Sequence, residues 1–196
     1  MPTLDVGLRH AVRFVALLNL AYFAIEFAVA TRIGSVSLFA DSVDFLEDAA
    51  VNFLIFAALG WSPRRRAKVG MALSAILLVP ALALLWTLWQ KFNVPVPPAP
   101  VPLSVTALGA LAVNLICAFR LATYRHHGGS LTRAAFLSAR NDAFANIAII
   151  AAALATAWTH SIWPDVMIGL AIAAMNIDAA REVWAAARGE HRSAEA

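Results

Sequence analysis

The residues most capable of chemistry gather in the stretch ADSVDFLEDA, residues 40–49, which holds four carboxylates in a chain that is 61% hydrophobic. Asp44 and Asp48 are four residues apart, so on a helix they lie about 40° from each other. Asp41 and Glu47 fall about 60° to either side of Asp44, so all four side chains share one face. Each Asp at the centre of a membrane helix costs about 2.5 to 3.5 kcal/mol. This face must therefore point to protein, water or a cation rather than to lipid.

The same spacing of polar residues occurs a second time, later in the chain. Asp44 is followed by polar residues at i+3, i+4 and i+8, and Ser138 is followed by polar residues at the same intervals. The segments DFLEDAAVN and SARNDAFAN align with Asp-Ala in register, which is typical of the weak internal repeats of transporters. Two such helices facing each other would form an oxygen-rich pocket within the membrane. The two sets are Asp44, Glu47, Asp48 and Asn52, and Ser138, Asn141, Asp142 and Asn146.

The oxygens of these side chains suit a divalent cation, because a dication offsets like charges that otherwise could not both stay ionised. Protons can occupy the same carboxylates once the cation leaves, so cation and protons compete for one site, as in an antiporter. For Asp44, Asp48 and Asp142 we favour this functional interpretation, since carboxylates within a membrane mark functional sites. For the small polar residues of the two stripes taken alone, hydrogen bonding between helices is the simpler interpretation.

Six long apolar runs must position these residues. The chain has 196 residues, of which 14% are charged, compared with about 25% in a typical soluble domain. Each run approaches the roughly 20 residues that a helix needs to cross the hydrocarbon layer. The sequence therefore predicts an all-α, polytopic membrane protein with six transmembrane helices. The expected spans are about residues 11–30, 39–60, 69–90, 104–123, 134–158 and 162–186.

The fifteen Lys and Arg residues predict the orientation of the chain. Most lie before the first span, in RRRAK at 64–68, around the link between the fourth and fifth spans, and at the end of the chain. The alternate links hold only Arg32 and Lys91. The positive-inside rule then places both termini in the cytoplasm. The net charge of +3 is explained by this topology, so it gives no reason to expect nucleic acid as a partner.

The links leave no room for a second folded domain. We expect a six-helix transmembrane domain over residues 1–187 and a short polar cytoplasmic tail over residues 188–196, with no C-terminal cytoplasmic domain. The prolines of NVPVPPAPVP, residues 93–102, cannot continue a helix and predict an extended, extracytoplasmic connector. Cys117 is the single cysteine, which excludes an intrachain disulfide.

The sequence resembles the cation diffusion facilitator family, whose members are six-span exporters of divalent transition metals. NLAYFAIEFAVATRIGSVSLFADSVDFLEDA and RNDAFANIAIIAAALATAWTHSIWPDVMIGLAIAA look like the first two and the last two helices of that family. The resemblance implies metal ligands at Asp44 and Asp48 on the second helix and at Asp142 and Ser138 on the fifth. Ser138 departs from the family's usual His or Asp, so the site becomes all-oxygen. The predicted accessory ligands are Asn141, Glu47, Asn146 and Asp41.

The resemblance also implies a function. We expect efflux of a divalent cation from the cytoplasm by metal/proton antiport and alternating access, carried out by a homodimer in the lipid bilayer of a bacterial inner membrane. The metal is then a substrate, and zinc, cobalt, nickel, iron, manganese and cadmium all stay open. The missing nitrogen ligand shifts the expectation toward harder ions, because carboxylate and carbonyl sets suit Mg and Mn best.

Two other functions stay open. Ser138 at a ligand position would also fit a non-transporting membrane subunit or a metal sensor with a degenerate transport site. The carboxylates could instead be the counter-ion for a small organic cation. The sequence contains no recognisable nucleophile-base pair or phosphate-binding loop, so neither an enzyme nor an ATP-driven pump is expected.

Asn19 and Glu26 are polar residues of the first span. They are seven residues apart, so they share one face of the expected helix, and they match recurrent positions of the family that the chain resembles. We favour a buried hydrogen bond to a neighbouring helix over a role in proton or metal access.

Overall fold

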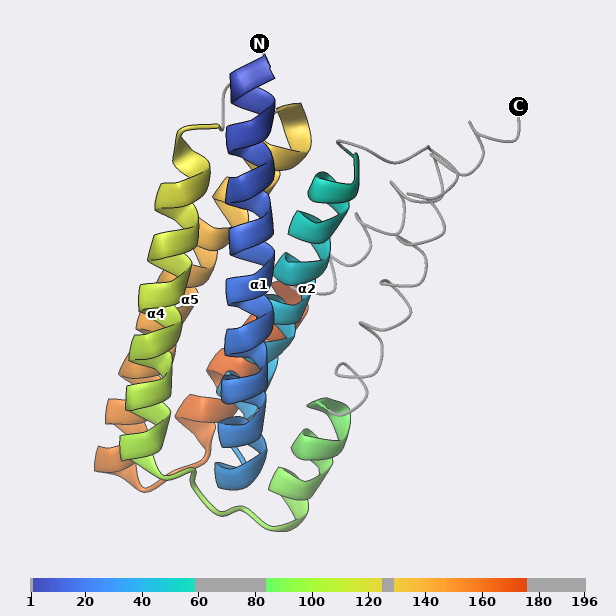
Figure 1. Ribbon diagram of the computed structural model, residues 1–196. Coiled ribbons are helices and arrows are strands. Elements are labelled where there is room, and N and C mark those ends of the chain that lie inside the picture. The colour runs from blue at the N-terminus through green and yellow to red at the C-terminus, as the bar shows by residue number, and fades with distance from the viewer. Residues whose placement is uncertain (1, 59–83, 125–128, 176–196) are drawn as a thin grey trace.

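The computed structural model describes residues 2–58, 84–124 and 129–175, and the regular elements of these residues are all α-helices (Figure 1). Two shorter helical runs cover residues 84–93 and Trp163–Met175. The described residues confirm the predicted all-α membrane bundle. The four long helices are α1 at Pro2–Ile33, α2 at Val36–Ala58, α4 at Pro100–Ala122 and α5 at Gly129–Thr159.

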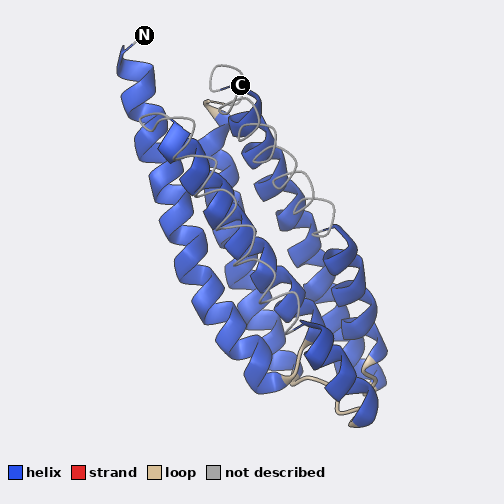
Figure 2. Ribbon diagram, turned by 90° about the vertical axis from the view of Figure 1, so that its right-hand side faces the viewer, coloured by secondary structure: helices blue, strands red, loops and turns tan. Residues whose placement is uncertain are grey.

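The four long helices run side by side around a common interior (Figures 1 and 2). α1 packs against α2 and α4, and α5 packs against the same two helices, so α2 and α4 lie diagonally across the bundle. This order makes α2 and α5 neighbours. The two polar stripes identified in the sequence therefore belong to adjacent helices.

Three of the described helices are long and apolar enough to cross a membrane, namely Val6–Ile33, Pro100–Ala122 and Ala135–Thr159. α2 has 23 residues but carries four acidic side chains, so its place in a membrane depends on compensation of those charges inside the bundle. The expected spans 69–90 and 162–186 lie partly outside the described residues, and the expected tail lies wholly outside them. The apolar helices support an integral membrane location.

α4 begins earlier than the proline-rich link predicted. The expectation of an extended connector as far as Pro102 is wrong at its end, because the helix starts at Pro100. Ala99, with a φ of −64° and a ψ of 119°, is the extended residue that precedes the helix. Proline is tolerated in the first turn of a helix, where its missing amide has no acceptor and its fixed φ is already helical.

The N-terminus of α2 is capped by a carboxylate from a distant part of the chain. Gly34 reverses the chain after α1 with a φ of 64°, a conformation that favours glycine. Asp165 is fully buried and accepts a hydrogen bond from the Val36 amide at 2.8 Å. Its Oδ1 also accepts the hydroxyls of Ser35 and Ser37, both at 2.6 Å. A negative charge is favourable here because the free amides of a helix N-terminus point toward it.

Gly169 allows the helix Trp163–Met175 to approach α2 closely enough for this cap. A Cβ atom at Gly169 would lie 2.7 Å from the carbonyl carbon of Val36, which is closer than real side chains come. Asp165 and Gly169 are four residues apart, so both face α2. The start of α2 is therefore fixed from two sides, by the turn after α1 and by this helix.

Two apolar clusters fill the bundle, one toward each end. We call the end where α1 ends and α2 begins, which also holds residues 94–99 and 160–162, the turn end, and the opposite end, where α1 begins, the N-terminal end (Figure 1). The buried carboxylates of α2 lie where the two clusters meet, so apolar side chains separate them from both ends. The cluster of the turn end includes Phe39, Leu103 and Ile149, and that of the N-terminal end includes Val12, Phe45 and Leu121.

Replacement of the capping carboxylate, Asp165→Ala, should lower the free energy of unfolding by about 3 kcal/mol or more, because it leaves buried hydroxyl and amide donors without an acceptor. Thermal or denaturant unfolding of the purified protein in detergent measures the effect. Ser37→Ala is the matched control and should cost about 1 kcal/mol, since it removes one donor and leaves the carboxylate paired. Unchanged stability of Asp165→Ala would contradict this account of the cap.

Candidate metal site

Ser138 connects two carboxylates that come from different helices. Its Oγ lies 3.0 Å from Oδ1 of Asp48 on α2 and 3.5 Å from Oδ2 of Asp142 on α5. A hydroxyl has one proton to donate, so the shorter contact with Asp48 is the stronger hydrogen bond. Both carboxylates are buried. The structure thus brings three of the four predicted ligands together between α2 and α5.

Asp44, the fourth predicted ligand, lies one turn from Asp48 along α2, toward the turn end. Its side chain is half-buried, and its carboxylate is close enough to Asp142 for electrostatic repulsion. Asp44 and Asp48 are four residues apart, so they project from the same side of α2. We call the region formed by Asp44, Asp48, Asp142 and Ser138 the acidic site.

No buried cation of the described residues balances the acidic site. Lys91 is the one Lys or Arg among their buried side chains, and it lies near the turn end in the helical run 84–93. Carboxylates held close together in a poorly polarisable interior repel one another strongly. They therefore need protons or a bound cation, and a divalent cation supplies positive charge while accepting several oxygen ligands.

The acidic site is not arranged as a closed coordination shell. Within residues 2–58, 84–124 and 129–175, no three Asp, Glu, His or Cys side chains converge closely enough to hold a metal ion. The hydroxyl of Ser138 is instead engaged with Asp48 and Asp142. Binding of a cation therefore requires the carboxylates to turn toward it, which would replace the Ser138 hydrogen bonds.

Asn52 and Asn146 occupy the same position in the two polar stripes and make the same hydrogen bond. Asn52 Nδ2 donates to the carbonyl of Asp48 at 2.9 Å, and Asn146 Nδ2 donates to the carbonyl of Asp142 at 2.8 Å. In each stripe the amide thus binds the backbone of the Asp four residues earlier. The repeat seen in the sequence therefore corresponds to a repeated local structure that fixes the turn of helix carrying a candidate ligand.

Asn141, one of the predicted accessory ligands, faces away from the acidic site. Its side chain is exposed, and its Oδ1 accepts a hydrogen bond from Arg140 Nη2 at 3.3 Å. Arg140 is also exposed. The oxygen of Asn141 is therefore engaged on the outer surface of α5.

Glu47 and Asp41, two further accessory candidates, lie on either side of Asp44 along α2. Glu47 is 8% exposed and close enough to Asp48 for electrostatic repulsion. Asp41 is fully buried and lies within hydrogen-bonding reach of Glu26 on α1. Glu47 therefore borders the acidic site, whereas Asp41 belongs to a separate contact between α1 and α2.

Asn19 and Cys117 form part of the α1 and α4 side of the interior. Both are fully buried, and Cys117 Sγ donates to Asn19 Oδ1 at 3.4 Å, so the hydrogen bond predicted between Asn19 and a neighbouring helix is present, with Asn19 as the acceptor. The thiol lies close enough to Asp48 and Asp142 to interact with their charges. The place of Cys117 beside the acidic site was not predicted, because a lone cysteine in an apolar run carries no signal that distinguishes it from a packing residue.

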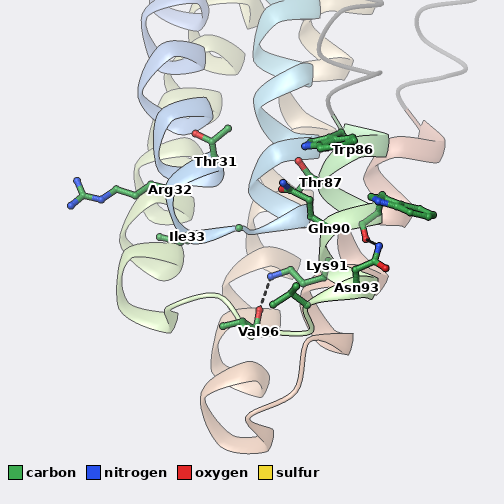
Figure 3. Close-up of a pocket in the computed structure, with 12 residues that line it drawn as sticks. Thr31, Arg32, Ile33, Trp86, Thr87, Gln90, Lys91, Asn93 and Val96 are labelled. Atoms are coloured by element: carbon green, nitrogen blue, oxygen red, sulfur yellow. Dashed lines mark hydrogen bonds between the residues drawn. The ribbon is translucent and has the colours of Figure 1, made fainter.

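A separate hollow of about 470 Å³ lies at the turn end (Figure 3). Arg32 of α1 lines one side, and Trp86 and Lys91 line another. Lys91 Nζ donates to the carbonyl of Val96 at 2.8 Å. The described lining contains two basic residues and no carboxylate, so this hollow is not suited to a metal cation.

The apolar helices and the acidic interior define a polytopic helical membrane protein with charged groups buried between its helices. A profile of the cation efflux transmembrane domain matches residues 12–188. The chain therefore belongs to the cation efflux family, which confirms the resemblance identified in the sequence.

The chain is also similar to a curated relative, the zinc transporter ZitB of Pectobacterium atrosepticum. The two proteins are 27% identical over 168 residues, which cover 78% of this chain and 50% of the relative. The chain thus spans about half the length of the curated relative that it matches.

Introduction of a nitrogen ligand, Ser138→His, should tighten zinc binding by about tenfold or more relative to manganese, because imidazole favours zinc whereas an all-oxygen site favours harder ions. Isothermal titration of the purified variant with each metal measures the change. Arg140→His places the same imidazole on the exposed face of α5 and should leave both affinities unchanged. Equal effects of the two substitutions would contradict a site at Ser138.

Proposed function

We propose that the protein transports a divalent metal cation out of the cytoplasm, with Asp44, Asp48 and Asp142 as the principal ligands and Ser138 between them. The observation that carries this proposal is the Ser138 contact, because it joins the equivalent turns of the two polar stripes across α2 and α5. Membership of the cation efflux family supports the same assignment. No covalent step is required, since the cation crosses the membrane unchanged.

The proposed substrate is a divalent transition-metal ion. The similarity to a zinc transporter makes zinc the first ion to test. The donors of the acidic site are all oxygen, which also suits manganese and other ions that accept hard ligands. Cobalt, nickel, iron and cadmium complete the panel of ions to test, because carboxylate oxygens can bind each of these divalent ions.

Protons are the proposed counter-substrate. When a dication leaves the acidic site, repulsion among its three carboxylates, two of them buried, favours uptake of protons in its place. Cation and protons then occupy the same oxygens in turn, and each one's release is a condition for the other's binding. Alternating access of this site to the two sides of the membrane would convert that competition into exchange.

The proposed setting is a bacterial inner membrane with both termini in the cytoplasm and two copies of the chain associated as a homodimer. The distribution of Lys and Arg supports this orientation. In this orientation the turn end of the bundle lies toward the outside. The acidic site would then open alternately toward the N-terminal end to load and toward the turn end to unload.

Asp48→Asn should abolish cation flux, because the amide keeps the shape of the side chain but loses a charged ligand. Uptake of zinc and manganese into proteoliposomes that contain the purified protein measures the effect, with a loss of at least tenfold expected. Thr156→Val is the matched control, since Thr156 is also buried on a long helix but lies in α5 far along the chain from Ser138 and Asp142. Its flux should equal that of the wild type. Wild-type protein that binds the cation without any flux would instead support the non-transporting sensor, which the oxygen ligand at Ser138 would also fit.

A pH gradient with an acidic lumen should drive accumulation of the cation in these proteoliposomes, because protons leaving the lumen are exchanged for cations entering it. An ionophore that exchanges protons for potassium abolishes the pH gradient, and it should reduce uptake until the cation concentration is equal inside and outside the vesicles. A pH-sensitive dye inside the vesicles should report alkalinisation of the lumen when zinc is added outside. Cation uptake that ignores both the gradient and its collapse would contradict proton exchange.

A further inference from the structure

Glu26 and Asp41 form a buried pair of carboxyl groups that the acidic site does not include. Glu26 comes from α1 and Asp41 from α2, and neither side chain is exposed. The two groups lie within hydrogen-bonding reach of each other. None of their four oxygens receives a hydrogen bond from any described residue. Two ionised carboxylates would repel each other here, so the pair needs protons or a cation.

Asn146 of α5 adds a third helix to this pair. Its Nδ2 donates one of its two hydrogens to the carbonyl of Asp142, at 2.8 Å. Its Oδ1 is buried and has no hydrogen-bond partner among the described residues, and its side chain reaches Asp41. Glu26, Asp41 and Asn146 therefore contribute five acceptor oxygens, against which the second hydrogen of Asn146 Nδ2 is the one donor left over. We call these three residues the three-helix cluster.

The number of unpartnered oxygens decides what fits the three-helix cluster. One shared proton links two carboxylate oxygens and leaves three of the five acceptors unsatisfied. It also leaves one negative charge buried, which is costly in a membrane interior. A second proton removes this charge but still supplies fewer donors than the cluster has acceptor oxygens. A divalent cation takes six or more oxygen ligands if it is hard and balances both carboxylates. The cation therefore satisfies the cluster more completely than a proton does.

The charged groups that the described residues place around the three-helix cluster are acidic. Glu26 interacts electrostatically with Asp44, and Asp41 interacts with Asp48, both of the acidic site. The phenol of Tyr22, one turn before Glu26 on α1, is also nearby, and its hydroxyl donates to the carbonyl of Thr106 on α4. No buried Lys or Arg of the described helices lies among these groups.

The three-helix cluster lies next to the acidic site, on the side of the turn end. Asp41 precedes Asp44 by three residues, a rise of about 4.5 Å along α2. Beyond Asp41, the apolar cluster of the turn end and the bonds of Asp165 with the start of α2 close the bundle. A cation leaving the acidic site in this direction would meet the three-helix cluster before it meets the turn end.

We infer that Glu26, Asp41 and Asn146 form a second binding site for a divalent cation, adjacent to the acidic site and toward the turn end. A role of this site in export rests on the proposed function, whereas its ability to bind a cation rests only on the five oxygens that lack hydrogen-bond partners. Its ligands are two carboxylates and one amide oxygen, with water completing the coordination. Binding at both sites would place two dications against the five carboxylates of the two sites, with Glu47 beside them.

The number of ions bound by the full chain tests the inference. The protein is purified in detergent, stripped of metal, dialysed against zinc chloride or manganese chloride, and analysed for bound metal by mass spectrometry. The wild type should bind two ions per chain. Glu26→Gln and Asp41→Asn, which keep the side-chain shapes, should each bind one, and so should the Asp48→Asn variant. Thr156→Val, which removes another buried and unpartnered polar group, should still bind two.

One ion per chain in the wild type would overturn the inference, whatever the variants do. Two ions retained by the double variant Glu26→Gln with Asp41→Asn would overturn it as well. A third result would also overturn it. If Glu26→Gln binds as many ions as the wild type but releases one proton fewer when metal binds, then Glu26 and Asp41 hold a proton in the wild type rather than a metal ion. Two ions bound without flux would leave the second site standing and contradict only the proposed transport, whereas flux with a single ion would do the reverse.

Discussion

Negative charge enclosed between membrane helices must be neutralised, and this requirement organises the interior of the bundle. Six carboxylates lie on α1, α2 and α5 within a short distance along the bundle axis, whereas the one buried base of the described residues lies near the turn end. Hydrogen bonds from a single serine hydroxyl offset only part of the repulsion. The rest must come from mobile positive charge. An interior that needs protons or metal ions for charge balance fits the proposed exchange of one for the other.

The two-fold repetition of polar residues explains how the interior is built. Each stripe carries an Asp whose backbone carbonyl is held by an Asn one turn later, and the two stripes face each other because α2 packs beside α5. Apolar clusters above and below confine the polar groups to one layer. The same helices thus provide apolar surface for the lipid and a polar lining for the interior.

Helical periodicity was enough to predict which residues share a face of one helix, as for Asp44 with Asp48 and for Ser138 with Asp142, whereas the choice of these four as ligands came from the family resemblance. It could not predict the partner of Asp165, because that contact joins segments about 130 residues apart and depends on the close approach at Gly169. The start of α4 was predicted too late because proline breaks a helix only in its interior. In the first turn of a helix proline is favourable. Asn141 lies at the edge of its stripe, where a small rotation of α5 decides between interior and surface.

The carboxylate of Asp165 has a mechanical consequence. It ties the first turn of α2 to the helix Trp163–Met175 through four donors, two hydroxyls and two amides. Tilting of α2 at this end without that helix would leave the buried carboxyl group of Asp165 without its four donors. We therefore expect α2 and the helix Trp163–Met175 to move together as one rigid unit. Any opening of the bundle would then occur between this unit and the other helices.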